Sequence, residues 1–210
     1  MNSLFDVYKD SPFMWFNTMV SIIAIAVILE RAFVLVFKYN ADGKGFMQNV
    51  ERHILANDLT QAINYCNTSS TPLATVVKSG LVKANRGGMA ISMGIDEALL
   101  QVTPQVEKRV GSLWAIANIA TLVGLIGTIY GLINSFTGLS QASAEARAQL
   151  LGAGIAEALY NTLLGLGVAV VCIFAHMLLS GMAKRIISDL DYYTSRLENL
   201  LTLRHDAERS

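Results

Sequence analysis

Three long stretches without a charged residue dominate the pattern of hydrophobic and polar positions along the chain. They cover residues 11–29, 110–144 and 158–183. Each is long enough to cross a bilayer, because a membrane-spanning helix needs about 20 mostly apolar residues. The pattern predicts an all-α integral membrane protein with transmembrane helices at 13–37, 111–137 and 152–182. The second and third helices are expected to extend into a cytoplasmic helical domain.

The segments between these stretches are more polar. Residues 1–12 and the small, polar stretch 138–151 are predicted to be an N-terminal segment and a loop on one side of the membrane. Residues 38–110 and 183–210 are predicted to be helical segments on the other side. Within 38–110, helical apolar spacing is found at 46–56 and 59–66, with Asp58 as a helix N-cap. Thr71-Pro72 suits another helix start, 86–88 is a break, and 90–108 is expected to run into the second span.

The composition supports a membrane protein. Charged residues make up 15% of the 210 residues, against about 25% in an average soluble domain. The apolar content excludes a disordered chain. Sixteen Lys and Arg balance sixteen Asp and Glu, so there is no basic excess to bind nucleic acid.

The basic residues gather near one set of span ends. Arg31, Lys38, Lys108, Arg109, Lys184 and Arg185 lie on that side, against Lys9 and Arg147 on the other. Because cytoplasmic loops carry the excess of Lys and Arg, the N-terminus is predicted to be periplasmic and the C-terminus cytoplasmic. Cys66 would then lie in a reducing compartment, and no disulfide is expected.

The second span carries small and polar residues at steps of three and four. These positions fall on one helix face and comprise Asn118, Thr121, Gly124, Thr128, Gly131, Ser135 and Gly138. The glycines, with Gly127, favour close helix packing. The recurring hydroxyls and Asn118 favour a polar cavity or a partner helix.

The third span carries a related stripe that includes Thr162 and Gly165, with Glu157 near its start. A carboxylate in or at the edge of a span is costly unless it is paired, and it marks a candidate functional site. Asn161 is four residues further on, so it can face the same cavity. Solvation of Glu157 at the outer interface is the alternative. For His176 a hydrogen bond to a neighbouring helix is favoured over a proton path.

Enzymatic and metal sites are not indicated. The three histidines show no ligand spacing with each other or with cysteine. No GxSxG, Walker A or GxGxxG motif is present. The chain is therefore predicted to be neither an enzyme nor a cofactor-binding protein.

Two motifs resemble those of the MotA/TolQ/ExbB proton channel family. ANIATLVGLIGTIYG (117–131) resembles the family's second-span motif, A-P-x-x-G-L-x-G-T-V-x-G, and IAEALYNTLLGLG (155–167) resembles its third-span motif. Residues 57–81 look like the family's cytoplasmic loop, and Glu-Arg at 30–31 fits the end of its first span. Three spans resemble the TolQ/ExbB branch, which includes gliding-motility subunits. The family's prolines fall here at Thr121 and Val171, so both helices are expected to be straighter.

The resemblance implies a proton-channel subunit of a motor driven by the proton-motive force in the bacterial inner membrane. Such subunits form a pentamer around a dimer of a single-span, ExbD/TolR-like partner that brings a membrane aspartate. By position, Thr128, Glu157 and Thr162 match the family's pore-associated residues, and Asn161, Thr121, Asn118 and Ser135 are further candidates for the proton path. Gly124, Gly127, Gly131 and Gly165 are candidates for helix packing. The alternatives are a non-conducting membrane scaffold and, less favoured, a small-solute transporter, because no inverted repeat is seen.

Overall fold

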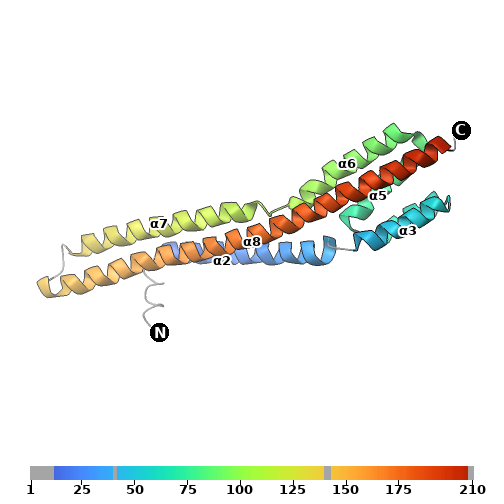
Figure 1. The fold of residues 1–210 in the computed structure, drawn as a ribbon. Coiled ribbons are helices and arrows are strands. Elements are labelled where there is room, and N and C mark those ends of the chain that lie inside the picture. The colour runs from blue at the N-terminus through green and yellow to red at the C-terminus, as the bar shows by residue number, and fades with distance from the viewer. Residues whose placement is uncertain (1–11, 40–41, 140–142, 208–210) are drawn as a thin grey trace. The chain divides into compact units, whose positions relative to one another are not determined.

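The computed structural model describes residues 12–39, 42–139 and 143–207, which are nearly all helical and include no strand. The elements are α2 (Pro12–Phe33), the π-helix η1 (Val34–Tyr39), α3 (Gly43–Leu55), α4 (Leu59–Asn67), α5 (Pro72–Val82), the 3₁₀-helix η2 (Ala84–Arg86), α6 (Gly88–Glu107), α7 (Ser112–Leu139) and α8 (Ala144–Ala207) (Figure 1). Among these residues, three helices are long and apolar enough to cross a membrane. The predicted all-α membrane fold is thus confirmed. The expected N-terminal segment before Pro12 and residues 140–142 lie outside the described residues.

The chain divides into two compact units. The first comprises Met1–Glu30 and Arg109–Leu178, and the second comprises Arg31–Lys108 and Leu179–Ser210. Helix α8 contributes its first part to one unit and its last part to the other. It has 64 residues and is about 96 Å long at 1.5 Å per residue. Nothing interrupts it, because the chain's three prolines are all at or before position 104.

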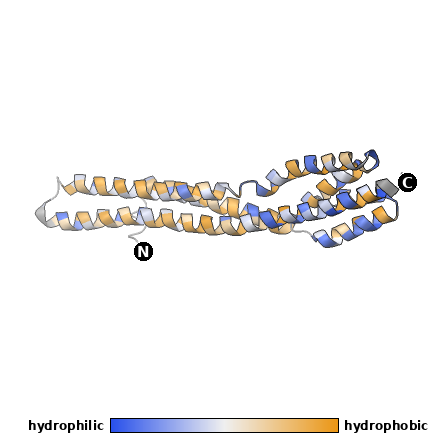
Figure 2. Cartoon of the chain, turned by 45° about the horizontal axis from the view of Figure 1, so that its top comes forward, coloured by the Kyte–Doolittle hydropathy of each residue, from blue (hydrophilic) through white to orange (hydrophobic). Residues whose placement is uncertain are grey.

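The first unit consists of α2, α7 and the first part of α8, and its outer surface is apolar. Figure 2 shows hydrophobic residues along these helices. Large exposed side chains include Trp15, Ile22, Leu122 and Leu163. A helix that is apolar on all sides is buried in a large core or in a membrane. Since these side chains face outward from the unit, lipid is the surrounding that their burial requires.

Helices α7 and α8 approach each other closely where glycines face one another. A Cβ placed on Gly165 would lie 2.5 Å from the Ala120 carbonyl oxygen and 3.0 Å from the Cα of Gly124. A Cβ on Gly131 would lie 3.2 Å from the Cβ of Ala158. Small residues at these positions let the two backbones touch, which is how helices associate in lipid. A small apolar cluster of Ala24, Ala117, Ala169 and Cys172 continues this packing.

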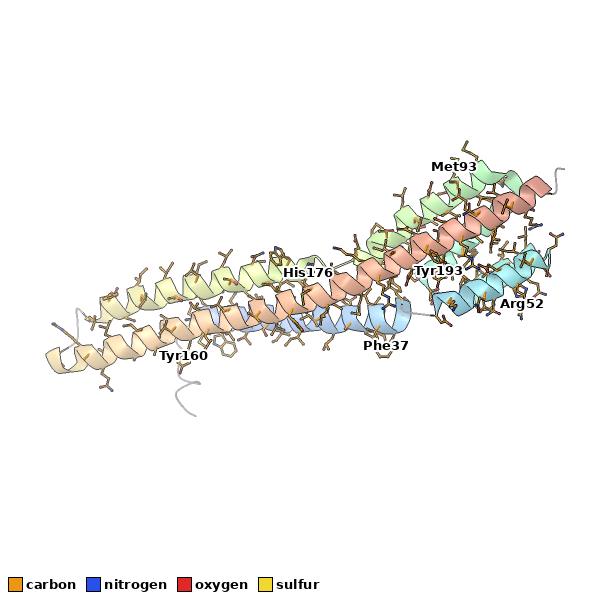
Figure 3. The ribbon with its side chains drawn as sticks, viewed as in Figure 1. Phe37, Arg52, Met93, Tyr160, His176 and Tyr193 are labelled. Carbon is orange, nitrogen blue, oxygen red and sulfur yellow. The ribbon has the colours of Figure 1, made fainter. Side chains whose placement is uncertain are left out.

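The second unit has an ordinary buried core formed by α3 to α6 and the last part of α8. Gly80 of α5 packs against Ile95 of α6 and Leu197 of α8, and a Cβ there would lie 3.0 Å from Ile95. On the surface of the unit, the Arg196 guanidinium bonds the Glu51 carboxylate at 2.7 Å. Figure 3 shows Tyr193 of α8 in this unit, and its ring lies against Gly43, whose Cβ would be 2.9 Å from Tyr193 Cε2.

The helix starts predicted from the sequence are confirmed in this unit. Asp58 accepts a hydrogen bond from the Gln61 amide at 2.9 Å and begins α4. Thr71 accepts from the Ala74 amide at 3.3 Å, with Pro72 in the first turn of α5. The expected break at 86–88 lies where Gly87 has φ 95°, a conformation that glycine adopts without strain.

Two connections differ from the sequence expectation. Within the predicted loop 138–151, α7 continues to Leu139 and α8 begins at Ala144. Ala, Glu, Arg, Gln and Leu fill 144–151, and these strong helix formers outweigh the polarity that suggested a loop. The helical path expected from 90–108 into the second span is interrupted at 108–111, where Arg109 has φ 60°.

Replacing Gly165 with Ala is expected to destabilise the helix pair by about 1–3 kcal/mol, because the added methyl group meets main-chain atoms that cannot rotate away. The measurement is the thermal unfolding midpoint in detergent micelles. Gly167→Ala is the matched control, since a Cβ on Gly167 meets nothing within 4 Å and alanine favours a helix. Equal effects of the two substitutions would contradict this packing.

Cys66, in the second unit, is expected to react slowly with alkylating reagents in the folded protein. Burial raises the pKa of its thiol from 9.0 to about 11, and the charge of Lys78 offsets part of this rise. At pH 8.5 the folded chain then has about 100-fold less thiolate than the unfolded chain. Iodoacetamide labelling of a Cys172→Ala variant, followed by mass spectrometry with and without denaturant, measures the ratio. Equal rates in both states would show that Cys66 is not buried in solution.

Candidate functional site

The sequence-predicted site residues lie on α7 and α8 in the first unit. On α7, Gly124, Gly127 and Gly131 are buried, Thr121, Thr128 and Ser135 are half-buried, and Asn118 and Gly138 are exposed. On α8, Asn161 and Gly165 are buried, and Glu157 and Thr162 are half-buried. The structure thus brings the middle of the two stripes together within one subunit.

Thr128 and Thr162 form the centre of the site. Their hydroxyl oxygens are in direct hydrogen-bond contact across α7 and α8. The Thr128 hydroxyl also lies 3.1 Å from the carbonyl oxygens of Gly124 and Ala158, and the Thr162 hydroxyl lies 3.3 Å from that of Gly124. Each hydroxyl has one proton to donate and two lone pairs. Because carbonyl acceptors lie on both sides, the two hydroxyls can donate both of their protons in hydrogen bonds and still accept a further one.

Asn161 and Glu157 lie one helical turn apart on α8 beside this pair. The side chain of Asn161 is 0% exposed, and its Nδ2 donates to the Glu157 carbonyl oxygen at 3.3 Å. Its Cβ and Cγ pack on Gly127, where an added Cβ would lie 2.9 Å from both atoms. Gly127 therefore makes room for the polar side chain of Asn161. From the sequence, Gly127 is predicted only to support helix packing.

The remaining candidates hydrogen-bond to their own helix. Asn118 Nδ2 donates to the Trp114 carbonyl at 3.0 Å, Thr121 to that of Ala117 at 3.1 Å, and Ser135 to that of Gly131 at 2.6 Å. Ser135 also faces α8, because a Cβ on Gly154 would overlap its hydroxyl. The structure does not join Asn118 to the threonine pair.

Two polar contacts are made next to the start of α7. His176 Nδ1 lies 2.9 Å from the Val110 carbonyl oxygen (Figure 3), so the expected structural hydrogen bond of His176 is made to the turn before α7. Arg109 bonds Glu30 at the end of α2 at 2.5 Å, and both side chains are partly exposed. These contacts tie all three helices of the unit together at one end.

Sequence reasoning missed Asn17 of α2. Its side chain is 0% exposed, and its Nδ2 would lie 3.2 Å from a Cβ on Gly165. The one available signal was an amide in the charge-free stretch 11–29, but no periodic polar stripe accompanied it. The first span therefore contributes a buried polar group at the point where α7 and α8 touch.

The chemistry of this site is that of hydrogen-bond exchange. Among the residues that the structure describes, no group of three His, Cys, Asp or Glu could hold a metal ion. The site consists of hydroxyls, amides and main-chain carbonyls, with a carboxylate one turn away. Such groups can bind a protonated carboxylic acid or water.

Comparison of the sequence with known proteins finds relatives of this chain. A Tol-Pal system protein TolQ of Haemophilus influenzae is 34% identical over 100 residues, which is 48% of this chain and 42% of that protein. An ExbB-like biopolymer transport protein of Synechocystis is 25% identical over 188 residues, 89% of each chain. A biopolymer transport protein of Vibrio cholerae is 35% identical over 96 residues, 44% of this chain and 42% of that protein.

The first and third matches thus cover less than half of the relatives' own lengths. The match to the family model is longer than these two and includes the part of α8 that carries Glu157 and Thr162. The MotA/TolQ/ExbB proton channel family matches residues 67–192, which is more than half of the chain. The family is one of proton channels and not of enzymes, and this chain belongs to it.

Proposed function

We propose that the chain is a proton-conducting, stator-type subunit of a motor that draws on the proton-motive force across the bacterial inner membrane. The observation that carries this proposal is the Thr128–Thr162 hydroxyl pair, held between two apolar helices. A polar centre in a lipid-facing unit is costly, and a proton path gives it a use. The TolQ- and ExbB-named relatives support a subunit of this kind.

The titrating acid would come from a partner. The charge-free stretches 11–29, 110–144 and 158–183 contain no aspartate. In the proposed assembly, five copies of this chain surround two copies of a single-span, ExbD/TolR-like protein with a membrane aspartate. The N-terminus is periplasmic and the C-terminus cytoplasmic, in agreement with the Lys and Arg near the span ends.

The proposed step is a handover of the partner's aspartate between subunits. The aspartate takes up a proton from the periplasm and becomes neutral. Because the threonine pair keeps acceptor capacity after both of its protons are placed, it would bind the protonated acid in preference to the carboxylate. Release of the proton to the cytoplasm weakens this bond, and the five-to-two mismatch then favours a step to the next subunit. A potential of 100 mV supplies about 2.3 kcal/mol per proton.

The other site residues have supporting roles in this proposal. Glu157 sets the electric field near the path, and Asn161 fixes the local conformation of α8. Asn118, Thr121 and Ser135 would line the route above and below the threonine pair. The motor would transmit energy to the cell envelope for transport, envelope maintenance or gliding motility, and the partner's periplasmic domain would select the process.

A non-conducting scaffold is the second candidate. The facing glycines at 124 and 165 and the carbonyl bonds of both threonines would also stabilise a purely structural helix bundle. Such a scaffold has no need of an aspartate-bearing partner and conducts no protons, so the two candidates differ in measurable ways.

Removing the Thr162 hydroxyl is expected to lower proton flux at least about fivefold, the factor that corresponds to one hydrogen bond of about 1 kcal/mol. Thr162→Val keeps the shape of the side chain, and Glu157→Gln is expected to lower flux as well. The assay is pH-dye quenching in liposomes that contain the complex purified with its partner. Thr75→Ala is the control, because the exposed Thr75 hydroxyl bonds only its own helix, 3.3 Å from the Thr71 carbonyl. Unchanged flux in both variants would overturn these assignments.

Purification of the tagged chain from native membranes in mild detergent is expected to retain a single-span protein with an aspartate in its span. Native mass spectrometry of the complex is expected to give five chains of 22.8 kDa with two partner chains. An assembly of this chain alone, with lipid in its centre and no proton flux, would favour the scaffold.

A further inference from the structure

Asn17 is a buried amide without a hydrogen-bond partner in the described part of the chain. Its side chain is 0% exposed. Neither Nδ2 nor Oδ1 has a partner among the residues that the structure describes. Neighbouring polar side chains differ: the Thr18 hydroxyl donates to the Met14 carbonyl at 2.8 Å, and Asn161 donates to that of Glu157.

The amide points at the crossing of α7 and α8. The position of a Cβ on Gly165 is 3.2 Å from Asn17 Nδ2 and 2.5 Å from the Ala120 carbonyl oxygen. The amide nitrogen and this carbonyl oxygen therefore both lie close to the same glycine. A helical carbonyl keeps a second lone pair, so one small molecule that both donates and accepts could reach both groups.

A partner from outside the subunit does not fit this position. Because Asn17 has no exposed surface in the single subunit, another chain could not touch its side chain without separating α2 from the crossing. Bulk water is absent from the surroundings of a spanning helix. Buried polar groups are nevertheless almost always hydrogen-bonded, and internal waters are the usual partners where the protein offers none.

We propose that Asn17 binds an internal water molecule where α2 packs on the crossing of α7 and α8. The water accepts from Asn17 Nδ2 and donates to the Ala120 carbonyl. It is thereby an integral part of the first unit. The bound species is water and not an ion, because the groups around it are neutral.

This water site extends the polar centre by about one helical turn. Gly124, which meets Gly165 at the crossing, is also the residue whose carbonyl accepts from Thr162. The water therefore lies next to the threonine pair along α7 and on the side of the Ala24, Ala117, Ala169 and Cys172 cluster. The first span then takes part in the polar interior and is not only a hydrophobic cover. This inference requires a bilayer around the chain but no proton conduction, so it goes beyond the proposed function.

The test is magnetic-resonance detection of water at the Asn17 side chain in the intact chain, reconstituted in bilayers. The dipeptide Phe-Asn occurs once, at 16–17, so carbonyl-labelled phenylalanine with uniformly labelled asparagine identifies Asn17 without any substitution. The expected result is a water cross-peak at the Asn17 side-chain amide, comparable in build-up rate with that of the exposed Asn57. Asn17→Leu should remove this peak, and Asn118→Leu should leave it unchanged.

A clear Asn17 amide signal without a water cross-peak, while Asn57 shows one, would overturn the proposal. Proton flux is measured in a separate experiment. A chain that conducts protons but lacks the water peak would refute only this inference, and a chain that shows the peak but does not conduct would refute only the proposed function.

Discussion

The close approach of α7 and α8 at Gly124 and Gly165 is the constraint on which the first unit depends. With no side chain at either position, the two backbones come near enough for Thr128 and Thr162 to meet one turn away. The same contact buries Asn161 against Gly127 and brings Asn17 of α2 to the crossing. In lipid, where apolar side chains gain nothing by leaving the solvent, such backbone contact and the hydrogen bonds that it permits provide the association energy.

The two units have different surfaces, but one continuous helix, α8, belongs to both. Up to Leu178, α8 belongs to a unit with many exposed apolar side chains, in which Asn17 and Asn161 are buried. From Leu179 onward, it belongs to a unit with a conventional core, where leucines such as Leu190 and Leu197 are buried and the ion pair of Arg196 with Glu51 is partly exposed. The absence of proline from α8 allows one element to serve both environments, although the family motif has proline at the position of Val171.

Local signals explain why much of the fold could be predicted. The side chains of Asp58 and Thr71 cap helices whatever surrounds them, and long apolar stretches need no tertiary information to be identified as spans. The break at 108–111 was missed because it contains one glycine, Gly111, and a single glycine is also tolerated inside a helix. The start of α8 was missed because a polar stretch can also form a good helix. Among the candidate site residues, spacing placed Thr128 and Thr162 on the polar stripes of two different spans, and the family resemblance marked both as candidates. Asn118, on the same stripe as Thr128, is exposed and lies apart from the pair.

The sequence alone predicts the helical class, the three spans, the family and the presence of a polar stripe, because each of these depends on composition, on periodicity or on a contiguous motif. Which polar residues meet can be seen only in the folded chain. The hydroxyl contact of Thr128 with Thr162 and the burial of Asn17 at Gly165 each depend on how far apart two helix axes lie and how the helices are rotated. A pattern along the sequence predicts which residues share a face of a helix. The distance between two such faces depends on how atoms from different segments pack. Here the glycines shorten that distance until the two backbones are in contact.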